Sequence, residues 1–319
     1  MLTPELLHYL SIGILIGLGS IGAGIGQGIA AFSSVGSMAR QPAGNDPIFR
    51  SMVIGLAFIE SGAIFALVIT LLLLFTVLPQ ITFAIAIAEL GISLAVGIAA
   101  LSISIASSFA VRATAVSISR QPFFAQKIIT LMLLAQSIIE APVVFAFVVA
   151  LIIKMNLTEA TTLFEGLKFL AASCCIALGC VGPSFGQAIF ANSSCKAVGL
   201  NKDVYNKIFT FSIINEAVIE TPLIFSLLIS IMLIFLPIPF KTPLSSTIGF
   251  LVSAFAVGIG SFGTAVSAGY VGSRSCNQLA LNPENYSFLF RSTILAQAFI
   301  ESSVIYCLII ALFLITKRF

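Results

Sequence analysis

The stretch MVIGLAFIESGAIFALVITLLLLF, Met52–Phe75, is apolar, long enough to cross a bilayer, and interrupted near its middle by one carboxylate, Glu60. Equivalent carboxylates follow at Glu140, Glu220 and Glu301, at intervals of 80, 80 and 81 residues (140−60, 220−140 and 301−220). A carboxylate in hydrocarbon is costly, and by default it marks an ion pathway. We therefore interpret the four glutamates as ion-binding residues of one repeated unit.

The composition is that of an integral membrane protein. Of 319 residues, 59% are hydrophobic and 8% are charged, and the mean hydropathy is +1.14. The alternate stretches are uncharged over more than the roughly 20 residues that a spanning helix needs: Tyr9–Ala39, Leu90–Val111, Phe169–Cys195 and Thr242–Ser273. The six cysteines lack the spacing of metal ligands. His8 is expected at the membrane edge, without a functional role. A net charge of +3 does not indicate nucleic acid as a partner.

A period near 80 residues indicates internal duplication. Each unit consists of two apolar helices joined by a short polar loop, and the four predicted hairpins are hairpin 1 (1–79), hairpin 2 (80–159), hairpin 3 (160–240) and hairpin 4 (241–319). The predicted fold is all-α, with eight spanning helices. Small residues recur at every second position of each first helix, which lets helix backbones approach closely and suits a tight ring: Gly22, Gly24, Gly26 and Gly28 in hairpin 1; Ser102, Ser104, Ala106 and Ser108 in hairpin 2; Gly182, Ser184, Gly186 and Ala188 in hairpin 3; Gly263, Ala265, Ser267 and Gly269 in hairpin 4.

Polar residues accompany the glutamates. Gln27 and Glu60 lie at the same depth on paired antiparallel helices, roughly 25 Å from the turn, and Gln187 and Glu220 repeat that spacing, whereas Ser107 and Ala268 stand at the glutamine position in the other two hairpins. The residues that follow the four carboxylates are Ser61, Ala141, Thr221 and Ser302. Such oxygens could form a cage for a sodium ion, or they could hydrogen-bond a protonated glutamate. The residues alone leave both interpretations open.

Two further features concern charge. Glu216 lies one turn before Glu220, where the other hairpins have Leu56, Gln136 and Gln297, and it either binds an ion or donates a hydrogen bond. A glutamate that faces lipid should stay neutral or ion-bound, and no Lys or Arg lies at that depth. The partner charge must therefore come from another subunit, which argues against a self-contained transporter.

The basic residues predict the orientation in the membrane. Ten lie on the loop side: Arg40, Arg50, Arg112, Arg120, Lys127, Lys196, Lys202, Lys207, Arg274 and Arg291. Five lie on the other side: Lys154, Lys168, Lys241, Lys317 and Arg318. Because basic residues are enriched on the cytoplasmic side, we expect cytoplasmic hairpin loops and both termini outside.

The segments GIGQGIAAFSSVGSMARQP, Gly24–Pro42, and FIESGAIFALVITLLLLF, Phe58–Phe75, resemble the c-subunit of the rotary ATP synthases in its F-type form. The resemblance covers all four units and is weaker in the loops of hairpins 3 and 4. An ordinary c-subunit is one hairpin, so this chain resembles four such hairpins fused in tandem.

The resemblance implies a non-catalytic rotor component that assembles into a homo-oligomeric ring in an energy-coupling membrane. The four glutamates would carry H+ or Na+ through the surrounding lipid and past the arginine of the stator's a-subunit. No cofactor is implied. Rotation would couple this movement to ATP synthesis or hydrolysis. The turns that would contact the central stalk are Arg40-Gln41-Pro42 and Arg120-Gln121-Pro122. The implied supporting ligands of a sodium site are Gln27, Ser61, Gln187, Thr221, Ser302 and Tyr306.

In the family the site lies between neighbouring hairpins, and this implies that a glutamine from one hairpin meets the glutamate and the following hydroxyl of the next. If each glutamine meets the glutamate of the following hairpin, Gln187 meets Glu301 and Gln27 meets Glu140. If it meets the glutamate of the preceding hairpin, Gln27 meets Glu301 of a neighbouring copy and Gln187 meets Glu140. Either way the four sites should not be equivalent. Protons are slightly favoured as the ion, and the alternatives are a sodium rotor of a vacuolar-type pump or, from another class, a secondary transporter, which would show inverted repeats and broken helices.

Overall fold

The computed structural model describes residues 3–76, 80–237 and 244–316. Within these ranges the chain forms four antiparallel helical hairpins: α1 (Pro4–Arg40) with α2 (Asn45–Phe75), α3 (Phe83–Arg120) with α4 (Ala125–Ile139) and α5 (Ala141–Met155), α6 (Leu163–Leu200) with α7 (Tyr205–Phe235), and α8 (Leu244–Leu281) with α9 (Tyr286–Thr316). Eight spans of these residues are long and apolar enough to cross a membrane. The predicted all-α fold of four hairpins and eight spanning helices is confirmed.

The helix ends are encoded locally. Thr3, Thr82 and Thr162 each accept a hydrogen bond at the side-chain oxygen from a backbone N–H three residues later, at 3.3, 3.3 and 3.4 Å, and so begin α1, α3 and α6 in the same way. At the opposite end each hairpin turns through a short 3₁₀ segment: Pro42–Gly44, Pro122–Phe124, Lys202–Val204 and Pro283–Asn285. The turns of hairpins 3 and 4 therefore keep the geometry of the first two although their sequences differ.

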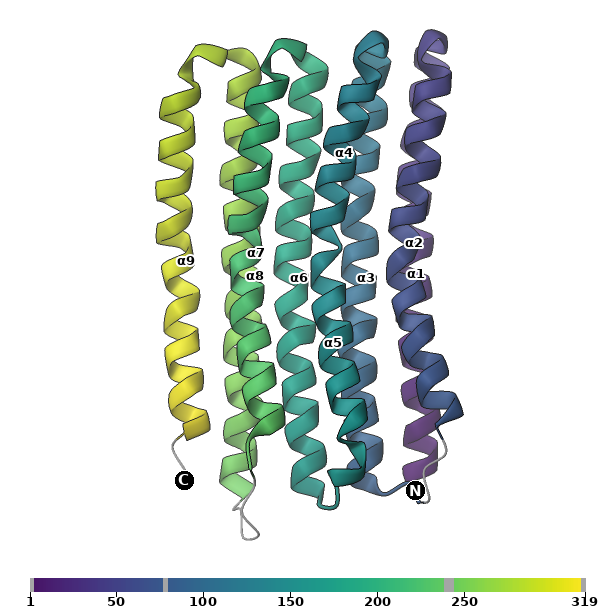
Figure 1. Cartoon of the computed structure of the whole chain (residues 1–319), viewed down its shortest axis with the longest axis vertical. Coiled ribbons are helices and arrows are strands. Elements are labelled where there is room, and N and C mark those ends of the chain that lie inside the picture. The colour runs from purple at the N-terminus through teal and green to yellow at the C-terminus, as the bar shows by residue number, and fades with distance from the viewer. Residues whose placement is uncertain (1–2, 77–79, 238–243, 317–319) are drawn as a thin grey trace.

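The hairpins stand side by side in two layers (Figure 1). The first-helix layer contains α1, α3, α6 and α8, each packed on the next, and the second-helix layer contains α2, α4 with α5, α7 and α9. Each of the first three second-layer spans packs against the first helix of its own hairpin and that of the following one. The hairpin turns lie at one end of the molecule, and the beginning of α1 and the end of α9 lie at the other.

Close backbone contact holds the first-helix layer together. A methyl group added at Gly22 would lie 2.6 Å from the Cα atom of Leu101 in α3, and one added at Gly26 would overlap the backbone carbonyl of Ser104. Between α6 and α8, additions at Gly186 and Gly269 would meet the backbone of the opposite helix. The alternating small residues are therefore the surfaces by which neighbouring first helices touch, as the sequence predicted.

The fourth span is interrupted at Glu140, so that it forms two helices where one was predicted. Pro142 has no backbone N–H and cannot continue the helical hydrogen-bond ladder past the glutamate. Pro222 stands at the same position in hairpin 3, where α7 remains continuous. Proline at this position therefore weakens the helix beside the glutamate, and the remaining packing decides whether it breaks.

A buried ion pair joins hairpins 1 and 2. His8 Nδ1 of α1 lies 2.6 Å from Glu89 Oε2 of α3, and both side chains are buried. Lys154 of α5 also interacts electrostatically with Glu89. An α-helix of 37 residues is about 55 Å long, well beyond a hydrocarbon core of about 30 Å, so this pair near the beginning of α1 lies close to the membrane surface. The sequence indicated no role for His8 and did not single out Glu89, because only the fold brings the two residues together.

Replacing Glu89 by alanine should leave His8 and Lys154 without their anion and destabilise the packing of hairpins 1 and 2. Breaking a buried pair from one side typically costs about 3–5 kcal/mol. Thermal unfolding of the purified protein in detergent measures the loss. The matched control is Glu5→Ala, which removes an exposed carboxylate from the first turn of α1 and should cost no more than about 1 kcal/mol. Equal effects of the two substitutions would contradict the ion pair's structural role.

Candidate functional site

The four glutamates lie in the second-helix layer, close to the boundary between their own hairpin and the preceding one. Glu60 is exposed because hairpin 1 has no preceding hairpin within the chain, and Glu140, Glu220 and Glu301 are partly buried. The fold thus brings each carboxyl to a boundary, which is where neighbouring repeats can contribute polar groups to it.

The boundary between hairpins 1 and 2 shows such a contribution directly. Ser61 Oγ lies 2.8 Å from Glu140 Oε1 and 2.7 Å from the backbone carbonyl oxygen of Phe58. A hydroxyl group has one proton to donate. Ser61 can donate this proton to Glu140 or to Phe58; when it donates to Phe58, a protonated Glu140 can donate to Ser61 Oγ. The arrangement therefore fits a neutral, proton-loaded glutamate.

Between hairpins 3 and 4 the equivalent hydroxyl belongs to Thr221, which interacts with Glu301 while it donates a hydrogen bond to the backbone carbonyl oxygen of Ala217 at 3.3 Å. At the boundary between hairpins 2 and 3 the corresponding residue is Ala141, which has no hydroxyl to offer Glu220. Ser302 of hairpin 4 donates to the carbonyl oxygen of Phe299 at 2.7 Å, as Ser61 does to Phe58. No following hairpin of the same chain contacts this hydroxyl, so it is available to a neighbouring copy.

The glutamines belong to the same hairpin as the glutamate that they accompany. Gln27 and Glu60 line one groove of about 530 Å³, and Gln27 Nε2 donates to the carbonyl oxygen of Leu56 at 3.5 Å. Gln187 of hairpin 3 makes the same contact with the carbonyl oxygen of Glu216 at 3.4 Å. Within the chain, Gln27 thus shares a groove with the glutamate of its own hairpin, and it is the hydroxyl of Ser61 that contacts the glutamate of the next hairpin.

The geometry of a helix explains why Ser61 contacts the next hairpin. Successive side chains point about 100° apart on a helix with 3.6 residues per turn, so Ser61 faces away from Glu60 and toward the following hairpin. Tyr306, which was predicted to support a sodium site, is 65% exposed on α9 and makes no hydrogen bond to the rest of the described residues.

The structure keeps the predicted stalk-contact residues at the turns. Arg40 and Arg120 end α1 and α3 with exposed side chains. Gln41 and Gln121 close the helices through backbone N–H groups that donate to Ser37 and Ser117, at 3.1 and 3.0 Å. Each proline begins the 3₁₀ segment that follows. These turns present basic side chains at one end of the bundle.

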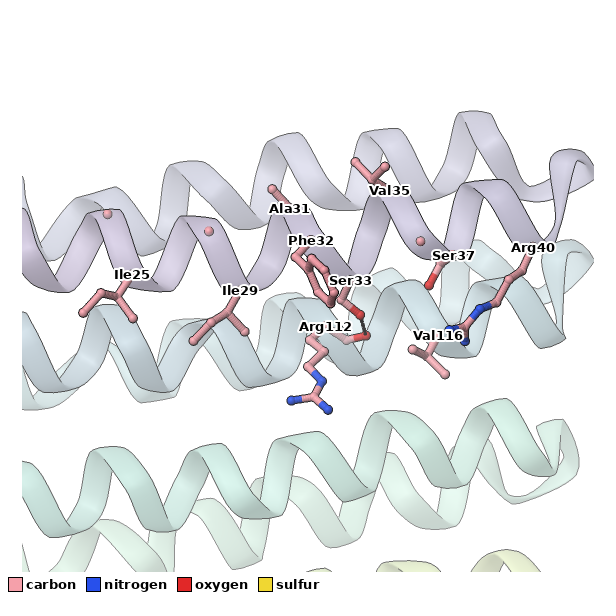
Figure 2. Close-up of a pocket in the computed structure, with 13 residues that line it drawn as sticks. Ile25, Ile29, Ala31, Phe32, Ser33, Val35, Ser37, Arg40, Arg112 and Val116 are labelled. Atoms are coloured by element: carbon pink, nitrogen blue, oxygen red, sulfur yellow. Dashed lines mark hydrogen bonds between the residues drawn. The ribbon is translucent and has the colours of Figure 1, made fainter.

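An open groove of about 1090 Å³ extends along α1 from its contact with α3 to its uncovered side (Figure 2). Ile25, Ile29 and Phe32 line it with apolar side chains, and Arg112 reaches it from α3. Gly24 and Gly28 also line it, and a methyl group added at either glycine would meet nothing within 4 Å. This edge of the first-helix layer therefore presents small residues that no other hairpin of the chain covers.

Comparison with known proteins gives the same repeat. A family model described as the C-subunit of ATP synthase matches residues 10–73, 90–153, 170–233 and 251–314. Proteins named as the c-subunit of ATP synthase are similar to parts of the chain. The one from Geotalea uraniireducens is 50% identical over 66 residues, which are 21% of this chain and 72% of the relative. The one from Dehalococcoides mccartyi is 44% identical over 71 residues, which are 22% of this chain and 93% of the relative. The one from a Synechococcus species is 47% identical over 66 residues, which are 21% of this chain and 82% of the relative.

Substituting the boundary hydroxyls should affect the glutamate of the following hairpin. Ser61→Ala removes the partner of Glu140. At a pH low enough to keep the carboxyl group protonated, release of a hydrogen bond of about 1 kcal/mol should raise the rate of carbodiimide labelling at Glu140 about fivefold. Thr221→Ala should do the same at Glu301. Peptide mass spectrometry measures each site separately, and Ser302→Ala serves as the control that leaves Glu140 and Glu301 unchanged. A change at Glu60 rather than Glu140 in Ser61→Ala would contradict this assignment.

Proposed function

This chain belongs to the ATP synthase c-subunit family, and we propose that it is the ion-carrying rotor protomer of a rotary ATP synthase, with Glu60, Glu140, Glu220 and Glu301 as the carriers. Each glutamate would take up an ion at one half-channel of the stator, travel through lipid in a neutral state, and release the ion at the other. Rotation would couple this movement to ATP synthesis or hydrolysis in other subunits.

The contact between Ser61 and Glu140 carries the proposal. A carboxyl group at a hairpin boundary can be held by the neighbouring hydroxyl while it faces lipid, because a neutral hydrogen-bonded group avoids the cost of a charge in hydrocarbon. Where water or a fixed positive charge reaches it, the carboxyl can ionise and release its ion. No Lys or Arg of the sequence lies at the depth of the four glutamates, so the proposed positive charge comes from the stator.

We propose protons as the transported ion. Glu140 and Glu301 have a boundary hydroxyl but no glutamine, and Glu220 has Gln187 but faces Ala141. A sodium ion prefers a cage of several oxygen ligands, and these three sites do not offer one common set. A proton needs only the carboxyl group and one acceptor, which all four sites can supply.

The second candidate, a sodium rotor, is favoured by one observation. Glu60 shares its groove with Gln27, and a second copy of the chain placed in the repeat's geometry would add the hydroxyl of Ser302. Glu60 would then be the one site with a glutamine, a carboxylate and a hydroxyl together. Sodium binding, where it occurs, should therefore be confined to Glu60.

We propose that several copies close into a ring. Gly186 of α6 and Gly269 of α8 meet at the boundary between hairpins 3 and 4. Their repeat equivalents, Ser267 and Gly28, are exposed on α8 and α1, the two end helices of the first-helix layer. Joining these helices between copies repeats the internal boundary and leaves no free edge.

The remaining partners follow from the family and from charge. The turns with Arg40 and Arg120 would contact the central stalk, and the stator's a-subunit would contact the second-helix layer. Basic residues favour cytoplasmic turns and termini outside an energy-coupling membrane. Lys241, Lys317 and Arg318, which entered that charge comparison, lie outside the described residues.

Carbodiimide labelling of the purified ring, with and without sodium, tests the role of the glutamates and the identity of the ion. The reagent modifies protonated carboxyl groups in apolar surroundings, so all four glutamates should react at mildly acidic pH. Proton transport predicts the same labelling rates in sodium at Glu140, Glu220 and Glu301. Protection of those three by sodium would overturn proton transport, and labelling at none of the four would overturn the rotor assignment.

Ring closure is tested by Gly28→Leu. A side chain at Gly28 meets nothing within 4 Å in the single chain, so the chain should fold, but leucine should block the closely packed boundary with the next copy. Native mass spectrometry should show wild-type rings at a multiple of 33.6 kDa and the variant as open or smaller assemblies. Phe32→Ala is the control, since Phe32 is 85% exposed and its equivalent Arg112 is also exposed. Intact rings of Gly28→Leu would contradict the proposed closure.

A further inference from the structure

Glu216 is a buried carboxyl group that the transport mechanism does not use. It lies one turn before Glu220 on α7, its side chain is fully buried, and neither carboxyl oxygen accepts a hydrogen bond from a described residue. A buried carboxylate without a counter-charge costs several kcal/mol. Glu216 therefore requires either a proton or another bound cation.

Its equivalents in the neighbouring hairpins show what this position does. Gln136 of hairpin 2 donates from Nε2 to the backbone carbonyl oxygen of Gly55 in hairpin 1, at 3.3 Å. Gln297 of hairpin 4 donates from Nε2 to Asn215 Oδ1 in hairpin 3, at 2.9 Å. Gly55 and Asn215 are themselves two repeats apart, at equivalent positions of α2 and α7. A hydrogen bond from this position thus crosses two of the three boundaries inside the chain.

At the third boundary, between hairpins 2 and 3, the equivalent residues are Glu216 and Ala135. Ala135 is buried and lies on α4, which packs against α7. Alanine has no polar side chain, so the acceptor available there is its backbone carbonyl oxygen. An ionised carboxylate has no proton to donate, whereas a carboxylic acid has the shape of glutamine with an O–H in place of the Nε2 donor.

We propose that Glu216 holds a resident proton and, as a neutral carboxylic acid, donates its O–H across the boundary between hairpins 2 and 3 to the backbone carbonyl oxygen of Ala135. This site takes a proton that stays in place, and it is separate from the four carriers. The resident proton is independent of which ion the rotor transports.

The groups around Glu216 favour a neutral acid. Glu220 lies on the same helix, and Cys195 of α6 and Cys276 of α8 interact electrostatically with Glu216. A carboxyl or thiol group is neutral when protonated and negative when deprotonated, so none of these three groups can supply a positive charge to a Glu216 carboxylate. From α4 the equivalent neighbour is Ala135, and Gln187 donates to the backbone carbonyl oxygen of Glu216 rather than to its side chain.

Burial also separates Glu216 from the carriers. A carrier must reach water or a fixed charge to release its ion, and Glu140, Glu220 and Glu301 are partly exposed at the surface of the second-helix layer. Glu216 is 0% exposed. An exchange of its proton would require hairpins 2 and 3 to separate, which a bond between them opposes.

The test compares Glu216→Gln with Glu216→Ala in purified rings. Glutamine can form the bond found at the other two boundaries, so Glu216→Gln should retain ring assembly and proton transport. By comparison, Glu220→Gln removes a proposed carrier and should reduce proton transport. Glu216→Ala should speed amide hydrogen exchange along α4 and α7 about fivefold through loss of one hydrogen bond. Loss of transport in an intact Glu216→Gln ring would identify Glu216 as a carrier and overturn the proposal.

Two further readouts detect the proton itself. The infrared difference between wild type and Glu216→Gln should contain the carbonyl band of one protonated carboxylic acid; a carboxylate band instead would overturn the proposal. Stability supplied by a bound proton is present at low pH and lost as the pH rises until the acid ionises. The wild type should therefore lose thermal stability at alkaline pH relative to Glu216→Gln, and equal pH dependence of the two would also contradict the resident proton.

Discussion

The structure depends on close backbone contact between the first helices of neighbouring hairpins. Lipid supplies no hydrophobic force that would draw helices together, so association relies on packing and on hydrogen bonds between helices. Gly22 and Gly26 approach the backbone of α3, and Gly186 and Gly269 bring α6 and α8 together in the same way. Side chains at these points would force the first-helix layer apart and with it the spacing of all four hairpins.

That spacing creates the functional boundaries. Because the first helices pack closely, each of the first three second-layer spans lies against two of them, and the glutamates come to the junctions between hairpins. A hydroxyl such as Ser61, which points away from its own glutamate, then reaches Glu140 of the next hairpin. The proposed ion carrier and its hydrogen-bonding partner therefore come from different repeats, and a neutral carboxyl group can remain within the membrane.

Fusion of four hairpins into one chain allows the boundaries to differ. A ring of identical single hairpins has one kind of boundary. Here Ala141 replaces the hydroxyl residue at one boundary, and Pro142 interrupts one span. Among the described residues, a pair like that of His8 with Glu89 occurs at one boundary. Glu216 takes the place of a glutamine at a further position. Each difference changes a hydrogen bond or a charge without altering the packing of the first helices, which explains how the repeats diverge while the fold is retained.

The sequence by itself determined the class of the protein. The apolar period of about 80 residues predicted four hairpins, and the small residues predicted their close contact, because each of these signals is local or repeated. The same period selects Glu60 and its three equivalents as the proposed ion-binding positions. Tertiary structure alone decided which polar groups meet. The assignment of Gln27 to Glu60 and of Ser61 to Glu140, the pairing of His8 with Glu89, and the burial of Glu216 all depend on helix rotation and on contacts between residues far apart in the sequence. Linear spacing specifies the depth of a side chain in the membrane, whereas the neighbour that it faces is set by how the helices pack.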